Sequence, residues 1–155
     1  MQDLNSQNSQ FNFENKIQKV LLKTKRPIYR EADIRHRFGQ SLSGISHAID
    51  LDNMCICIKT KWQQTKISNQ EVMEFISNVN NLSLIIMKKC VGIFISNVDL
   101  SVVGQQQFDM ENLKNQNHYT ILSDSDYISL IKKIYYYFHS NGIWFYDGED
   151  SMMVY

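Results

Sequence analysis

The side chains with the clearest potential for chemistry lie in a stretch that alternates between polar and apolar residues. Two β-rich runs flank the dipeptide Asp52-Asn53, which predicts a hairpin with a two-residue turn. In that register Ser46 faces Lys59, and Lys61 follows on the same face of the sheet. A hydroxyl and two ammonium groups on one face favour an anion such as phosphate over a metal cation.

The same register pairs Ala48 with Cys57 and Asp50 with Cys55 on that face, and it directs His47 to the opposite one. We interpret His47 as a packing residue. The other three histidines have no Cys or carboxylate partner at metal-ligand spacing, so we assign no metal site to them: His36, His118 and His139. The chain has three cysteines, an odd number without a CxxC pair, which we interpret as buried, reduced thiols.

Composition is that of one ordinary folded domain. The chain has 155 residues, of which 43% are hydrophobic, and its 16 basic and 16 acidic residues give no formal net charge. No run is long and apolar enough to cross a membrane, and the polar first ten residues do not resemble a signal peptide. We therefore expect a protein that is neither secreted nor membrane-bound and that lacks a uniformly basic surface.

Periodicity in the first half predicts helices on either side of the hairpin. We expect a mobile polar tail over 1–10 and a single domain over 11–155. An apolar stripe predicts a helix over 13–24 that ends before Pro27, and a second helix is expected over 31–38, ending at Gly39. Ser68, with Glu71 three residues later, predicts the capped start of a further helix.

The second half predicts a buried parallel strand and a final helix. The apolar run over 90–96 is too short for a helix and suits a strand parallel to the 54–61 strand. Residues 97–117 show little pattern, so we expect a polar loop there, followed by a short strand over 118–122. Ser123 or Asp124 is expected to cap a helix that runs to about 139 with apolar positions Ile128, Ile131, Ile134, Tyr135 and Phe138, before a last strand in 142–150.

Half of the basic residues lie in one segment, between Lys16 and Arg37. Such a segment can contact nucleic-acid phosphates without sequence preference, and an ordinary solvated helix face is an equally good interpretation. The candidate nucleic-acid-binding residues are Lys59, Lys61, Lys23, Lys25, Arg26, Arg30, Arg35 and Arg37.

The last predicted helix carries aromatic residues on every side. Positions 135–138 read Tyr-Tyr-Tyr-Phe, and a helix that is apolar on every side must be covered either by its own core or by a partner.

The order of these elements, with 44–62 at its centre, resembles the restriction endonuclease-like (PD-(D/E)XK) superfamily. The likeness is to its Mrr-like branch, including proteins of large DNA viruses, and it covers about residues 13–139. Gly44-Ile45-Ser46-His47 is similar to the motif that opens the first hairpin strand of that family, and Ile58-Lys59-Thr60-Lys61-Trp62 is similar to the one that closes the second. The resemblance implies an α/β fold with a restriction endonuclease-like core: a mixed sheet with a central β-hairpin, flanked by helices.

The resemblance also implies where a catalytic site would lie. In the family an Asp and a Glu or Gln hold Mg²⁺ and a Lys assists the attacking water, but here Ser46 and Lys59 occupy the ligand positions and only Lys61 matches. At about 4 Å and an effective dielectric of 20, Lys59 would repel each charge of a metal by roughly 4 kcal/mol. Substitute ligands are Asp50, about 13 Å along the strand, and Glu71 and Glu74 of the next helix.

These observations favour a catalytically inactive member of the superfamily, acting as a homodimeric DNA-binding or scaffold protein, of viral origin. We expect no metal and no cofactor. One alternative is an active Mg²⁺-dependent DNA nuclease with displaced carboxylate ligands, the only case that needs Mg²⁺. Another is a structural or virion protein that does not bind nucleic acid. The expected partners are a second copy and double-stranded DNA, and the expected location is the inside of a host cell or a virion.

Overall fold

A computed structural model describes residues 2–114, 117–147 and 151–152. The elements along the chain are α1 (Gln2–Leu22), β1 (Ile28–Arg30), α2 (Glu31–Phe38), β2 (His47–Asp50), β3 (Met54–Lys61), α3 (Asn69–Ile86), β4 (Lys89–Ser96), α4 (Val102–Lys114), β5 (His118–Ser123), α5 (Tyr127–Ser140), β6 (Tyr146–Asp147) and β7 (Ser151–Met152). Among these, no helix is long and apolar enough to cross a membrane.

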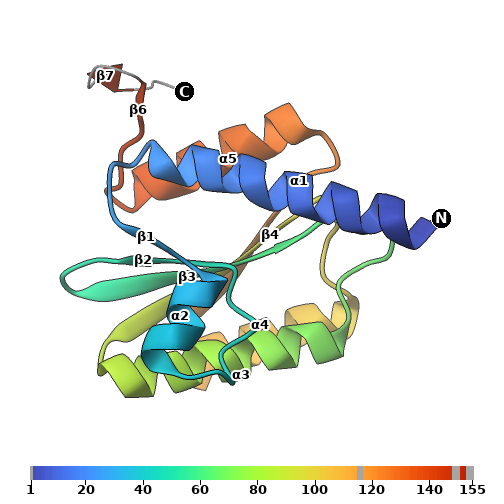
Figure 1. Cartoon of the computed structure of the whole chain (residues 1–155). Coiled ribbons are helices and arrows are strands. Elements are labelled where there is room, and N and C mark those ends of the chain that lie inside the picture. Colours follow the sequence, from blue (N-terminus) through green and yellow to red (C-terminus); the bar gives the residue numbers. More distant parts are fainter. Residues whose placement is uncertain (1, 115–116, 148–150, 153–155) are drawn as a thin grey trace.

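Five strands form one mixed sheet in the order β1-β2-β3-β4-β5. The first three are antiparallel, whereas β4 and β5 run parallel to β3, as predicted for β4. Helices cover both faces: α1 and α5 lie on one, and α2, α3 and α4 on the other (Figure 1). This mixed sheet with a central hairpin and flanking helices confirms the predicted α/β fold class (Figure 1).

The hairpin register follows the prediction through the whole of β2. Ala48 pairs with Cys57 and Asp50 with Cys55, so alternate residues divide between the two cores as the pattern indicated. Ile56 and Ile58 pack under α1 and α5, while Cys55 and Cys57 pack under α3.

Two predicted helices have the expected boundaries. Helix α2 spans 31–38, and Gly39 follows it with a φ of 136° that suits a glycine. Ser68 caps α3: its Oγ accepts a hydrogen bond from the Glu71 N–H, and the Glu71 carboxylate accepts one from the Ser68 N–H. The start of α3, and with it the direction of Glu71, is therefore fixed by a local motif.

Helix α1 begins at Gln2, eleven residues before the start that the apolar stripe predicted. Residues 2–10 carry no apolar stripe, and the segment is tied to the sheet by Gln10 instead. The Gln10 side chain accepts a hydrogen bond from Trp62 N–H at 2.6 Å and donates one to Thr60 C=O at 3.0 Å. Phe13 packs on Trp62 one turn later, with ring centroids 5.1 Å apart. Strand β1, after Pro27, was also not predicted.

The predicted loop over 97–117 is wrong for its central part, which forms α4. This helix buries only Gly104 and Phe108, so it lacks the repeating apolar stripe by which a helix is recognised. Ser101 marks its start, since its Oγ accepts a hydrogen bond from the Gly104 N–H at 3.0 Å.

The last helix is capped by a different residue than predicted. Asp126, not Ser123 or Asp124, accepts the hydrogen bond from Ser129 N–H, and α5 runs to Ser140. Ile128, predicted to face the core, is 65% exposed, and Leu130 is buried in its place. Of the predicted last strand, only Tyr146–Asp147 forms one; residues 148–150 lie outside the described part of the chain.

Candidate functional site

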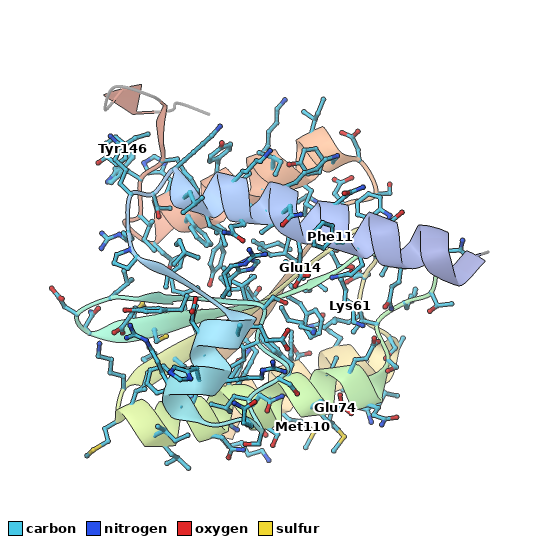
Figure 2. The ribbon with its side chains drawn as sticks, viewed as in Figure 1. Phe11, Glu14, Lys61, Glu74, Met110 and Tyr146 are labelled. Atoms are coloured by element: carbon cyan, nitrogen blue, oxygen red, sulfur yellow. The ribbon has the colours of Figure 1, made fainter. Side chains whose placement is uncertain are left out.

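A polar pocket of about 490 Å³ opens between the end of β3, the first half of α3 and the segment that follows α2. In Figure 2, Lys61 lies between α1 and α3, and Glu74 lies on α3. The pocket is lined by Ser41, Ser43, Gly44, Lys59, Lys61, Glu71, Glu74, Phe75, Ser77, Asn78 and Phe94. It therefore brings together both predicted lysines and both predicted glutamates.

Lys59 is a partly buried cation in this pocket. Alternation along β3 directs it to the α3 side of the sheet, where the residue is partly buried. Burial, and then the neighbouring Lys61 charge, lower the pKa of Lys59, while the charges of Glu31, Glu14 and Glu71 oppose this shift. No carboxylate of the described residues lies within 4.0 Å of its ammonium, so Lys59 is a desolvated cation without an ion-pair partner.

Lys61, in contrast, is paired. Its Nζ lies 3.4 Å from Glu71 Oε1, and the other Glu71 oxygen accepts the Ser68 N–H at 2.8 Å. Burial acts to raise the pKa of Glu71, but the Ser68 N–H and the Lys61 charge outweigh it, so the net effect is a lowered pKa. Glu71 is thus held as a carboxylate by its helix cap and by Lys61.

Ser46 does not lie on the pocket face beside the two lysines, which corrects the predicted grouping. It precedes the first residue of β2, and its side chain is buried. Ser46 Oγ accepts hydrogen bonds from Thr60 N–H at 3.2 Å and Thr60 Oγ1 at 3.4 Å. The hydroxyl therefore helps to fix the end of β3 and does not line the pocket.

Asp50 is not a substitute ligand, because it lies at the other end of the hairpin. It pairs with Cys55, six residues from Lys61, a separation of about 20 Å at the usual strand rise. Asp50 Oδ1 forms an ion pair with Lys88 Nζ at 2.7 Å. Of the three substitute ligands that the sequence suggested, the pocket contains only Glu71 and Glu74.

These side chains do not fit a magnesium ion. Mg²⁺ prefers six oxygen ligands, usually with one or two carboxylates, in a near-ideal octahedron. Here Ser46 faces elsewhere, Asp50 is distant, Glu71 is already shared between Lys61 and Ser68, and Lys59 adds a positive charge. Within the described ranges, three or more His, Cys, Asp or Glu side chains at metal-binding separation occur only as the trio of cysteines.

The basic segment is divided by the fold instead of forming one surface. Lys23 and Lys25 lie at the end of α1 beside β6, where the Lys23 carbonyl accepts the Tyr146 N–H and Lys25 stands over the Tyr146 ring. Arg26 follows in the turn after α1. These residues belong to the α1 side of the sheet, whereas the pocket is on the α3 side.

The arginines of the segment have a separate set of neighbours. Arg30 donates to Asn15 of α1 at 3.5 Å, and the Arg37 guanidinium stacks 4.8 Å from the Tyr29 ring centroid. Arg35 is partly buried, and its Nε has no hydrogen-bond partner among the described residues. None of the three lines the pocket.

His47 lies on the opposite face from the pocket lysines, as predicted. It is 1% exposed, and burial together with the Arg30 charge lowers its pKa to about 4. The imidazole is therefore neutral at physiological pH.

Four polar pocket residues were missed by sequence reasoning: Ser41, Ser43, Ser77 and Asn78. Asn78 could have been predicted from the sequence, because it lies one helical turn after Glu74 and two turns after Glu71. The three residues therefore share one face of α3. Gly44 permits its approach: a Cβ at Gly44 would lie 2.3 Å from the Asn78 amide nitrogen. The serines lie in irregular chain, where no periodicity predicts direction.

Comparison with known proteins gives little beyond this geometry. No family model matches the chain, and no curated protein matches it. Among solved structures, a repair endonuclease from Pyrococcus abyssi superposes with a TM-score of 0.48 and 16% sequence identity. The match covers 75% of this chain and 46% of that one, so the matched region spans less than half the length of that protein.

Proposed function

We propose that this chain binds the phosphate backbone of double-stranded DNA in the pocket between β3 and α3, and does not cut it. The observation that carries the proposal is Lys59, a partly buried ammonium next to a second lysine and without a carboxylate partner among the described residues. A phosphate oxygen supplies the negative charge that Lys59 lacks, and a charge-assisted hydrogen bond of this kind is stronger than one between neutral groups.

The polar lining supports the same ligand. Hydroxyls of Ser41, Ser43 and Ser77 and the amide of Asn78 offer hydrogen bonds to phosphate oxygens. Glu71 holds Lys61 in place and offsets its positive charge. Lys59 therefore provides most of the attraction for a phosphate. Contacts of this type carry no base sequence preference, and the resulting affinity falls steeply with salt.

The test is fluorescence anisotropy of a labelled 20-base-pair duplex with the full chain at low and moderate salt. We expect Lys59→Glu combined with Lys61→Glu to weaken binding at least tenfold at low salt and to reduce the salt slope by about two, one for each lost phosphate contact. The matched control is Lys89→Glu combined with Lys132→Glu, which changes the net charge equally at exposed positions away from the pocket.

Each result separates the candidate functions. Equal affinity of the pocket variant and the control variant contradicts the proposal, and absence of binding by the unaltered chain favours the non-nucleic-acid scaffold. Inclusion of Mg²⁺ and analysis of the recovered duplex tests the nuclease alternative, for which the presence of Glu71 and Glu74 in the pocket is the favouring observation. Cleavage that disappears in Glu74→Gln would establish that alternative.

We also propose that the chain forms a homodimer, acting within a host cell or a virion. The aromatic helix does not require a partner, because Tyr135 and Phe138 are buried in the chain's own core. The large exposed apolar side chains lie mainly on another layer, that of α3 and α4: Met73, Leu84, Ile85, Val102, Val103, Met110 and Leu113. A second copy packed on this layer would cover them.

A further inference from the structure

Three cysteines from two neighbouring strands meet inside the core. Cys55 and Cys57 lie two residues apart on β3 and so share a face, and Cys90 on β4 is the register partner of Cys55. Their Sγ atoms all lie within 4.8 Å of one another, and none of the three forms a disulfide. The sequence predicted buried thiols but not their convergence, because it does not give the register between β3 and β4.

This separation is close to what a bound metal ion requires. A point equidistant from three sulfurs that lie at most 4.8 Å apart is at most about 2.8 Å from each, compared with about 2.3 Å for a zinc–thiolate bond. Each sulfur therefore needs to move by only about half an ångström to reach bonding distance. Rotation of the Cys side chains supplies such a movement without a change in the strands.

The surroundings offer three sulfur ligands and no strong fourth ligand. The cysteines are 3%, 0% and 0% exposed and belong to the apolar cluster under α3, so bulk water does not reach them. Across the part of the chain that is described, no histidine, carboxylate or further thiol joins the trio. The polar groups beside the trio are the Lys88 carbonyl, 3.9 Å from Cys90 Sγ, and the Ser83 side chain, which hydrogen-bonds to Cys90.

The three thiols form hydrogen bonds with one another. Hydrogen bonds from Cys55 and Cys57 lower the pKa of Cys90, whereas hydrogen bonds with Cys55 and Cys90, together with burial, raise the pKa of Cys57. Lys88 lies beside the trio: its ion pair with Asp50, and to a lesser extent the charge of Cys55, raise the pKa of its ammonium.

We propose that Cys55, Cys57 and Cys90 form a binding site for one soft, thiolate-preferring metal ion in three-coordinate geometry, Cu(I) in particular. Soft thiolate ligands select Cu(I) and zinc among the common ions. Structural zinc sites are almost always four-coordinate, and this trio provides neither a fourth protein ligand nor access for water. Cu(I) displaces thiol protons to the solvent on binding and undergoes no redox change.

The site would join β3, the central strand of the sheet, to its neighbour β4, independently of DNA binding. The test uses the full chain, reduced and kept free of oxygen, in competition with a chromophoric Cu(I) chelator. We expect one Cu(I) per chain, an X-ray absorption signature of three sulfur neighbours, and a higher Tm for the copper-loaded chain. Cys57→Ala and Cys90→Ala are each expected to lower the affinity for Cu(I) at least tenfold.

Ala48→Gly is the matched control, since Ala48 pairs with Cys57 on the same face and its loss loosens the same region without removing a sulfur. We expect this variant to retain one Cu(I). If a cysteine variant fails to fold, protection of the unaltered chain's thiols from maleimide by Cu(I) provides the second test. The proposal is overturned if the unaltered chain does not retain Cu(I), if the cysteine variants bind it equally well, or if zinc binds in preference with a fourth ligand.

Discussion

At the residue scale, the chemistry of the pocket depends on which lysine has a carboxylate partner. Lys61 pairs with Glu71 at 3.4 Å, and both side chains are about one-third exposed, so solvent weakens the attraction. Lys59 is also partly buried but has no such partner among the described residues. An incoming anion therefore meets one free cation and one that is already half neutralised.

Glu71→Gln tests this balance. Glutamine keeps an oxygen that can accept the Ser68 N–H, so the helix cap is retained while the negative charge is lost. Lys61 then becomes a second free cation, and we expect the affinity for duplex DNA at low salt to rise two- to tenfold. Anisotropy titrations at two salt concentrations measure the change, which should shrink as salt screens the charges.

Glu111→Gln provides the comparison, because Glu111 also pairs with a lysine, Lys114 at 3.5 Å, on α4 and outside the pocket. We expect this variant to bind DNA with the affinity of the unaltered chain. A decrease in affinity for Glu71→Gln would mean that the carboxylate contributes to the ligand site, which would count against phosphate binding by the lysines alone.

The sequence could predict the site residues that lie on regular elements, and not the others. Strand alternation placed Lys59 and Lys61 on one face, and the capping motif placed Glu71 at the start of α3. Ser46 precedes its strand, where alternation no longer determines direction, and it bonds to Thr60 instead. The same limit explains why Ser41 was missed.

At the element scale, β4 is a strand that contributes buried side chains to the cores on both faces of the sheet. It is buried from Cys90 to Ser96, with Phe94 facing α3 and α4 and Ile93 and Ile95 facing α1 and α5. Its apolar run was long enough to predict a buried strand. Helix α4, which covers it, was not predicted because it contacts the core through little more than Phe108, so a tertiary contact and not a sequence pattern determines it.

Gly92 shows how tightly this strand is packed. A Cβ at Gly92 would lie 2.6 Å from a Tyr119 ring carbon and 3.0 Å from a Phe75 ring carbon. Both rings belong to the buried aromatic group under α3, so neither can move freely. We expect Gly92→Ala to lower the free energy of unfolding by about 1–3 kcal/mol, the usual cost of overpacking, as measured by urea denaturation.

Gly44→Ala adds the same methyl group at a place where the obstacle is the terminal amide of Asn78. That side chain lines the pocket and can rotate away, so we expect a loss of less than about 1 kcal/mol. Equal losses for the two variants would contradict the view that the aromatic group is rigid.

At the scale of the whole molecule, the sheet separates two surfaces with different properties. The pocket and the exposed apolar side chains of α3 and α4 lie on one side. Helices α1 and α5 cover the other side (Figure 1). The basic segment runs through both sides, which is why counting its charges along the sequence did not define a surface. A linear pattern predicts the layers but not which residues share an outer face.

This arrangement gives the homodimer proposal a specific test. Leu84 and Leu113 are 77% and 90% exposed near the ends of α3 and α4, where burial of each leucine in an interface would remove its side chain from water. We expect light scattering to give twice the chain mass for the unaltered protein and the monomer mass for Leu84→Glu combined with Leu113→Glu. Ile128→Glu with Tyr136→Glu, at exposed positions of α5, should remain dimeric. Dissociation by the α5 pair alone would place the interface on the aromatic helix, and a monomeric unaltered chain would refute the dimer.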